Sequence, residues 1–197
     1  NVSIIGAGSM GPGIAIALAA TGRVRLFDID EKALEKASET IDTAANTLAS
    51  HPASQVNHPA ELTEQIILEV ELERAVESSD FIFEAVAEDF EIKKSVYKEI
   101  EDLVADETII ASNTSSLPLN QLCTSLEAAE RFVGAHWIHP PQISPVVEVV
   151  QADANTDVTI ARVMNLLRDG GKKLVRLQRP IKGYIGNRIQ SAMAREA

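Results

Sequence analysis

Residues 1–20, NVSIIGAGSMGPGIAIALAA, decide the fold class of this 197-residue chain. A short apolar strand pattern leads through a glycine-rich turn into an apolar stretch of helical length. The glycines of the turn have the G-x-G-x-x-G spacing, and the strand before and the helix after give that motif its weight. Glycine is needed because a tight turn and a closely approaching pyrophosphate leave no room for a Cβ, while the helix N-terminus offers free N–H groups. A dinucleotide site is therefore predicted at Gly6, Ala7, Gly8, Ser9, Met10 and Gly11.

An acid at the end of the next expected strand favours one dinucleotide. Taken alone, the glycine turn could still be a ligand-free connection between a strand and a helix. Asp28 ends the strand pattern RVRLFD about 20 residues after Gly8, where such folds position the carboxylate that accepts the ribose hydroxyls. A carboxylate also repels a 2′-phosphate, so the sequence predicts NAD rather than NADP. Arg23 and Arg25 lie earlier on this strand and are expected to be surface residues.

Strand and helix patterns alternate from the first residue, which predicts an α/β fold of the Rossmann type. The expected sheet is doubly wound and mostly parallel, with helices on both faces. VSII and TIIAS are continuous apolar runs, as strands buried on both faces should be. Segment 90–104 repeats Ile92, Val96, Ile100 and Leu103 at helical spacing, with Glu and Lys on the other face. The expected strands are 2–6, 23–28, 66–70, 80–86, 108–112, 131–136, 146–150 and 173–177.

The α/β alternation ends near residues 180–183, and this gives the expected domain organisation. Residues 1–182 should form the dinucleotide-binding domain. Residues 183–197, GYIGNRIQSAMAREA, should form the first helix of a helical second domain that is mostly absent, so we expect the chain to be part of a longer protein. Segment 50–60 contains two His-Pro pairs, which predict a surface loop in which His51 and His58 are solvated.

Composition argues against several classes of function. The chain has 18 Lys and Arg against 29 Asp and Glu, and its net charge of −11 repels nucleic-acid phosphates and anionic membrane surfaces. No apolar run reaches spanning length, and the first residues lack the pattern of a signal peptide. A single cysteine, Cys123, rules out an internal disulfide and fits a reducing compartment, so the cytoplasm is expected. No metal is expected, because Cys123, His136 and His139 lack the spacing of a zinc site.

Segment 131–150, RFVGAHWIHPPQISPVVEVV, carries the candidate chemistry. His136 ends an expected strand, and ligands of open α/β sheets bind at the carboxyl edge of the strands. Alone, His136 could be a structural histidine at a strand end. Glu148 lies among four valines, and an ionised carboxylate buried there costs several kcal/mol unless a partner compensates it. A histidine is the partner that we expect.

In order and spacing, these motifs resemble the N-terminal domain of the L-3-hydroxyacyl-CoA dehydrogenase family, which includes lambda-crystallin-like gulonate dehydrogenases. The resemblance covers essentially the whole chain. Each motif is weak alone, but six in the same order are specific. They are GAGSMGPGIA at 6–15, Asp28, EAVAED at 84–89, SNTSSLP at 112–118, the His136 and Glu148 pair, and GYIGNR at 183–188.

The resemblance implies an NAD-dependent 3-hydroxyacyl-CoA dehydrogenase of fatty acid metabolism, working as a homodimer through the helical second domain. His136 would be the general acid/base, and Glu148 would fix its tautomer and stabilise the imidazolium. Ser115 and Asn187 would hydrogen-bond the substrate oxygen near the histidine. For Ser115, a simple turn or helix-cap role is the alternative.

The resemblance also assigns three residues to the cofactor. Glu88 and Lys93 would lie near its ribose and nicotinamide, and Asn113 on the nicotinamide side. From the residues alone, Glu88 and Lys93 could equally be a solvated pair on a helix face.

Two features depart from the family. His139 stands in HWIHPP, where many members have an asparagine three residues after the histidine. A second titratable ring there could shift the pH profile, or it could pack under Trp137. Residues 37–73, where family members supply a lysine for CoA, contain no Lys or Arg and seven acids. We therefore expect weak binding of CoA substrates, with a free 3-hydroxy acid or a small polyhydroxy acid as the competing substrate.

The sequence also bears on three other kinds of protein. A UDP-sugar dehydrogenase needs a nucleophilic cysteine, and Cys123 lies in an apolar-periodic stretch that predicts a buried, inert thiol. The 6-phosphogluconate type needs a catalytic lysine, and none stands beside Asn187. A non-enzymatic NAD-binding module stays open, although His136 and Glu148 together argue against it.

Overall fold

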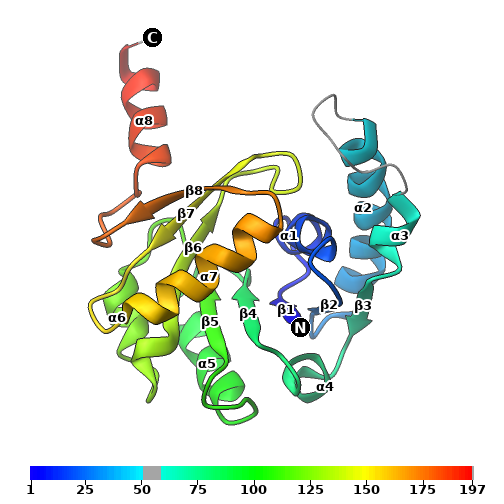
Figure 1. Ribbon diagram of the computed structural model, residues 1–197, viewed down its shortest axis with the longest axis horizontal. Helices are drawn as coiled ribbons and strands as arrows, with labels where there is room; N and C mark the ends of the chain where they lie inside the picture. Colours follow the sequence, from blue (N-terminus) through cyan, green and yellow to red (C-terminus); the bar gives the residue numbers. More distant parts are fainter. Residues whose placement is uncertain (51–58, 197) are drawn as a thin grey trace.

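The computed structural model describes residues 1–50 and 59–196, and its centre is one sheet of eight strands in the order β3-β2-β1-β4-β5-β6-β7-β8 (Figure 1). All the strands that we expected are present, and VSII and IIAS are fully buried as predicted. The strands are β1 Val2–Ile5, β2 Val24–Phe27, β3 Ile66–Glu69, β4 Phe81–Glu84, β5 Ile109–Ser112, β6 Phe132–Trp137, β7 Val146–Val150 and β8 Lys173–Leu177.

The sheet is parallel from β3 to β6, and β7 pairs with β6 in the antiparallel sense. β8 then runs parallel to β7. The prediction of a mostly parallel sheet is thus confirmed, with one reversal after β6. The reversal has a functional consequence, because it sets residues of β6 and β7 directly opposite each other. One of these register pairs is His136 and Glu148.

Helices cover both faces of the sheet, as a doubly wound fold requires. One core contains residues of α1, α2 and α7 and the other contains residues of α4, α5 and α6, on opposite sides of the strands. The helices are α1 Gly11–Ala19, α2 Glu31–Ser50, α3 Pro59–Thr63, α4 Leu72–Val76, α5 Phe90–Glu101, α6 Leu119–Cys123, α7 Asp157–Asp169 and α8 Gly186–Glu196, with a 3₁₀ turn at Ala129–Arg131. Among the helices described, none is long and apolar enough to cross a membrane.

The periodicity predicted for segment 90–104 is wrong in part. Helix α5 ends at Glu101, and Ile92 and Leu103 are exposed. The buried face instead carries Lys93, Tyr97 and Ile100. Lys93 is only 1% exposed, so the solvated helix-face pair considered for it does not exist. The expectation for His51 and His58 lies outside the described residues.

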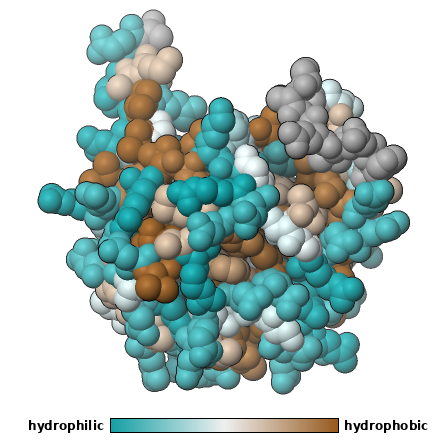
Figure 2. All heavy atoms as spheres, in the orientation of Figure 1, coloured by the Kyte–Doolittle hydropathy of each residue, from teal (hydrophilic) through white to brown (hydrophobic). Residues whose placement is uncertain are grey.

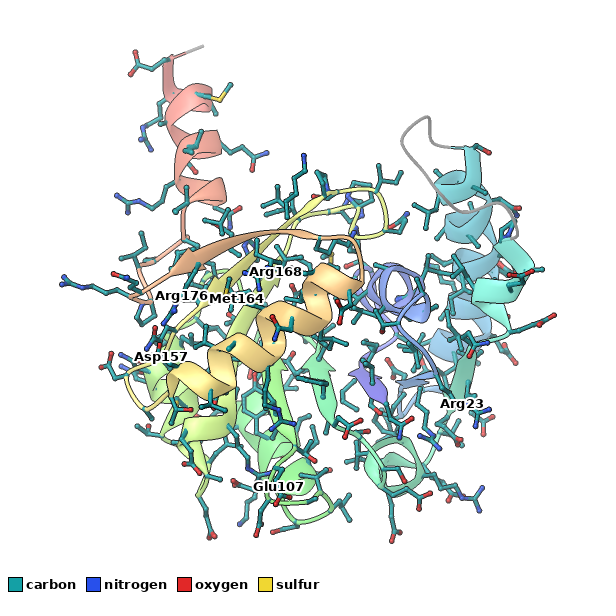
Figure 3. The ribbon with its side chains drawn as sticks, viewed as in Figure 1. Arg23, Glu107, Asp157, Met164, Arg168 and Arg176 are labelled. Carbon is teal, nitrogen blue, oxygen red and sulfur yellow. The ribbon has the colours of Figure 1, made fainter. Side chains whose placement is uncertain are left out.

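The last helix, α8, stands away from the rest of the molecule beside the edge strand β8 (Figure 1). None of its described residues is buried. Apolar atoms gather at its base (Figure 2), and this end of the chain exposes Ile181, Ile185, Ile189 and Met193. At the same edge, Arg176 of β8 lies 2.7 Å from Asp157 of α7 and ties the strand to the helix that precedes it (Figure 3).

Candidate functional site

The glycine turn between β1 and α1 is shaped as a dinucleotide site requires. Gly6 has φ +109°, and a Cβ there would lie 2.7 Å from the Ala85 carbonyl oxygen. A Cβ on Gly11 would lie 1.9 Å from the carbonyl oxygen of Gly6. Gly8, in contrast, has open space in front of it, with no atom within 4 Å of a Cβ position. Two glycines therefore close the turn and the third leaves room for a ligand.

The N-terminus of α1 offers free donors beside that space. Its N-cap, Met10, makes no side-chain hydrogen bond to the helix, and the first turn contains no acid. Pro12 occupies the first turn, where its missing N–H costs nothing. An anionic phosphate is the ligand that such an end favours. The residues present thus fit a dinucleotide.

Asp28 follows β2 and holds the same turn. Its Oδ2 accepts a hydrogen bond from the Ala7 N–H at 2.8 Å, and its Oδ1 accepts one from the Asp30 N–H at 3.0 Å. Both oxygens retain lone pairs that can accept ribose hydroxyls. Arg23, just before β2, is exposed (Figure 3), and Arg25 is half-buried. Arg23 is thus the surface residue that we expected, while Arg25 is only partly so.

His136, near the end of β6, and Glu148, in the middle of β7, form a buried pair. The Nδ1 atom of His136 lies 2.7 Å from Oε2 of Glu148, and the two residues are 6% and 2% exposed. The predicted partner for the buried glutamate is thus confirmed. The other oxygen, Oε1, accepts the backbone N–H groups of Ile185 and Gly186 at 2.8 and 2.9 Å. Glu148 therefore joins the histidine to the beginning of α8.

One cavity of about 700 Å³ collects most of the predicted site residues. It lies at the carboxyl ends of β1, β4, β5 and β6, where the fold type binds ligands. From the predicted set it is lined by Gly8, Ser9, Met10, Glu88, Lys93, Asn113, Ser115, His136 and Asn187, and His139 and Gln190 line it too. Gly6, Ala7, Gly11, Asp28 and Glu148 are not among its lining residues.

Glu88 holds the loop that carries Ser115. Its Oε1 accepts the N–H groups of Ser115 and Ser116 at 2.8 and 3.0 Å and the Thr114 hydroxyl at 2.8 Å. Burial alone would raise the pKa of Glu88, but these bonds and the charge of Lys93 lower it below its ordinary value. The Ser115 hydroxyl also points to Glu88, at 3.3 Å. The turn and helix-cap roles considered for Ser115 are thus not seen, since Thr114 bonds the Leu117 N–H instead.

A buried polar network lies behind the cavity, and no motif in the sequence indicates it. Glu84, at the end of β4, is fully buried and lies 2.5 Å from the Lys93 ammonium. Its Oε2 accepts the hydroxyls of Tyr97 and Ser112. Burial, with the charge of Glu84, raises the pKa of Tyr97 well above its ordinary value, so this phenol stays a donor. The network fixes the position of Lys93 in the cavity wall.

Asn113 links two neighbouring strands of the sheet. Asn113 Oδ1 accepts the Trp137 N–H at 2.9 Å, which ties β5 to the strand that carries His136.

Cys123 is buried, as predicted, and burial raises the pKa of its thiol to about 11. A thiol with that pKa is a poor nucleophile. Among the described residues, no group of three or more His, Cys, Asp or Glu is arranged to hold a metal ion.

Comparison with known proteins identifies relatives of the whole chain. Residues 1–180 match the family model for the 3-hydroxyacyl-CoA dehydrogenase NAD-binding domain. A 5-formyl-3-hydroxy-2-methylpyridine 4-carboxylate 5-dehydrogenase of Mesorhizobium japonicum is 34% identical over 100% of this chain and 63% of its own length. The lambda-crystallin homolog of Homo sapiens is 30% identical, over 100% of this chain and 62% of its own length. The chain thus spans less than two thirds of the length of these relatives.

Solved structures agree. The structure of a (S)-3-hydroxybutyryl-CoA dehydrogenase from Ralstonia eutropha has a TM-score of 0.90 at 30% identity, over 99% of this chain and 69% of that one. The structure of a 5-formyl-3-hydroxy-2-methylpyridine 4-carboxylic acid 5-dehydrogenase has a TM-score of 0.88 at 33% identity, over 100% of this chain and 63% of that one.

Proposed function

The chain belongs to the 3-hydroxyacyl-CoA dehydrogenase family as its NAD-binding domain, and on that premise we propose that it catalyses the reversible oxidation of a substrate 3-hydroxyl to a 3-keto group. The observation that carries the proposal is the buried contact of 2.7 Å between His136 Nδ1 and Glu148 Oε2. A carboxylate on Nδ1 keeps the proton there and leaves Nε2 as the base. His136 also lines the cavity, so Nε2 has access to a substrate.

In the oxidation, Nε2 of His136 accepts the proton of the 3-hydroxyl while the bond between C3 and its hydrogen breaks. NAD, when bound, supplies the acceptor for the hydride from C3. The imidazolium that results is stabilised by the Glu148 carboxylate, and in the reverse direction it returns the proton to the ketone oxygen. His136 is the catalytic residue, and Glu148 positions it.

Ser115 and Asn187 are proposed to hydrogen-bond the substrate oxygen while it changes between hydroxyl and ketone. Both line the cavity beside His136. Ser115 comes from the loop that Glu88 fixes, and Asn187 from the first turn of α8. Donors near the oxygen stabilise its developing charge, and the loop of Ser115 is held for this role before the reaction.

The cofactor residues are proposed on the same basis. Gly6, Ala7, Gly8, Ser9, Met10 and Gly11 would hold the pyrophosphate, and Asp28 the ribose. Glu88, Lys93 and Asn113 line the cavity beyond the turn, where the nicotinamide half would lie. Lys93 is held by Glu84 and Glu88 at 2.5 and 3.4 Å, so it would act as a fixed donor.

The proposal also covers the substrate, the domain organisation and the compartment. A 3-hydroxyacyl-CoA, and with it fatty acid metabolism, follows from the family. The lysine-free, acidic residues 37–73 favour instead a free 3-hydroxy acid, such as a gulonate-like polyhydroxy acid. We also propose that residues 1–182 are one domain and 183–197 the first helix of a helical second domain that forms a homodimer. The cytoplasm is the compartment that we propose, because the one cysteine is a free thiol.

The test is NADH oxidation by the protein in its full natural length, with acetoacetyl-CoA and with acetoacetate. We expect turnover of at least one of them. His136→Gln and His136→Ala should lower kcat by two or more orders of magnitude with NADH binding intact, the usual scale for a general acid/base. Glu148→Gln should lose most of the activity as well. Near-native turnover of the His136 variants would refute the assignment, and tight NADH binding without any turnover would favour a non-enzymatic module.

A further inference from the structure

We propose that His139 recognises the carboxylate of a free hydroxy or keto acid, an inference that rests on the proposed function of His136 and names its substrate class. His139 follows β6 by two residues and His136 by three. Its side chain is exposed, and it lines the same cavity as His136. A small acid bound for reaction at His136 would therefore lie within the reach of both rings.

The loop that begins with His139 is anchored at several points. The Lys172 ammonium donates to the carbonyl oxygens of Pro141 and Ser144 at 2.7 and 2.9 Å. Pro141 is buried and packs so closely against Gly13 of α1 that a Cβ there would lie 2.7 Å from its ring. The backbone next to His139 is thus held in place. Only its side chain is left to adapt to a ligand.

Among the titratable side chains of the cavity lining, His139 differs from the others. These others are Glu88, Lys93 and His136, and each has an internal partner. Lys93 contacts Glu84 and Glu88, and His136 contacts Glu148. The ring of His139 makes no hydrogen bond or ion pair to any residue that the structure describes. A ligand anion would find in it a ring N–H donor that no internal acid already occupies.

Two neutral donors stand close by on α8. Asn187 and Gln190 line the cavity and also make no side-chain hydrogen bond within residues 1–50 and 59–196. A carboxylate has two oxygens with about four acceptor sites, so it can take the imidazole N–H of His139 and the amide N–H of Gln190 together, while Asn187 donates to the substrate oxygen at His136. A thioester at the same position carries no charge and would gain little from His139. The lining thus discriminates in favour of an acid.

Binding is tested first, by NMR on the natural-length protein with NADH bound and its histidines labelled with ¹³C. The ring signal that disappears in His139→Asn belongs to His139. Acetoacetate should shift this signal saturably, whereas ethyl acetoacetate, its neutral ester, should leave it nearly unchanged. The same shift with acid and ester, or none with either, would overturn the proposal. This readout does not depend on turnover.

Kinetics supply the second test. His139→Asn should raise the KM for acetoacetate at least tenfold, about 1.4 kcal/mol, with kcat within about twofold and the KM for ethyl acetoacetate unchanged. Lys173→Gln is the matched control. Lys173 is exposed and lies beside the same loop, but it does not line the cavity. It should change neither KM.

The outcomes separate the two proposals. Equal losses with acid and ester in His139→Asn would show a merely structural role and refute this inference alone. Turnover of acetoacetyl-CoA that depends on His136, with acetoacetate indifferent to His139, would do the same. Near-native turnover by His136→Gln would refute the proposed function, while the NMR shift still decides on His139.

Discussion

Among the residues that the structure describes, three buried side-chain atoms have no hydrogen-bond partner: Arg131 Nε, Trp137 Nε1 and the hydroxyl of Tyr184. Glu148, Glu84 and Lys93 each have partners within the described structure. The hydroxyl of Tyr184 does not, although the residue is only 2% exposed. Its ring centroid lies 5.3 Å from that of His136, and its backbone has a φ of 45°, which is strained for a non-glycine residue. Burial, with the charges of Glu88 and Glu148, raises its pKa.

An unpaired buried hydroxyl is a cost that a substitution can remove. Tyr184→Phe should therefore raise the free energy of unfolding by about 1 kcal/mol, because the phenol loses no protein partner. Tyr97→Phe is the matched control, since the Tyr97 hydroxyl bonds Glu84 and its removal should destabilise by about 1–3 kcal/mol. Urea denaturation of the two variants measures both. Similar decreases in the free energy of unfolding of both variants would mean that the Tyr184 hydroxyl has a partner in solution.

Asp28 controls the choice of nucleotide in our proposal. Its carboxylate is oriented by the Ala7 and Asp30 N–H groups, so it cannot easily turn away from a 2′-phosphate. We expect NADH to bind at least tenfold more tightly than NADPH, about 1.4 kcal/mol, by fluorescence titration. Asp28→Asn keeps an oxygen that can accept the Ala7 N–H but removes the negative charge. It should therefore reduce the preference for NADH over NADPH. Equal affinities in the unmodified protein would contradict the role of Asp28.

At the scale of elements, the strands could be predicted because their signal is local. Continuous apolar runs such as VSII are typical of central parallel strands, and β1 is buried throughout. The glycine turn and the pairing of His136 with Glu148 were also predictable, since each depends on a spacing or on a buried charge that needs a partner.

The buried side of α5 was not predictable from its own residues. Ile92 suggested the inner face, yet Lys93 lies there, because Glu84 on β4 supplies a carboxylate that compensates the buried ammonium. That partner lies nine residues away and belongs to a different element. A periodic pattern reflects only hydrophobicity and does not include such a partner. For the same reason, it does not predict the hydrogen bonds that the Tyr97 and Ser112 hydroxyls make to Glu84.

Lys172, which anchors the loop 139–145, should make the free energy of unfolding depend on pH. Burial lowers the pKa of Lys172 to about 8, while in the unfolded chain it would be about 10.4. Between these values the unfolded state binds more protons than the folded state, so stability rises with pH there. From pH 7 to pH 9.5, the free energy of unfolding should rise by on the order of 1–2 kcal/mol more than that of Lys172→Met. Urea denaturation of both proteins measures this, and a constant difference would indicate an ordinary lysine pKa.

At the scale of the whole molecule, charge and shape act together on the substrate. The chain has a net charge of −11, and the acids of residues 37–73 include Glu39 and Asp42 of the long helix α2. Helix α2 covers the same side of the sheet as α1, whose N-terminus would receive the pyrophosphate. A dinucleotide would thus depend on short-range hydrogen bonds to overcome a repulsive long-range field. A CoA ester, with its 3′-phosphate and pyrophosphate, meets the same field without a lysine in residues 37–73.

Salt separates the two substrate classes, because it screens charges that are farther apart than about 10 Å at 0.1 M. If residues 37–73 repel CoA, raising the ionic strength from about 0.02 to 0.2 M should lower the KM for acetoacetyl-CoA several-fold. The KM for acetoacetate should change little or rise, since its single charge would meet His139 at contact distance. A double variant, Glu39→Lys with Asp42→Lys, should lower the KM for acetoacetyl-CoA at low salt and remove most of the salt effect. A KM for acetoacetyl-CoA that instead rises with salt would mean that cations elsewhere in the protein hold the CoA phosphates, and that the acidic residues 37–73 do not select the substrate.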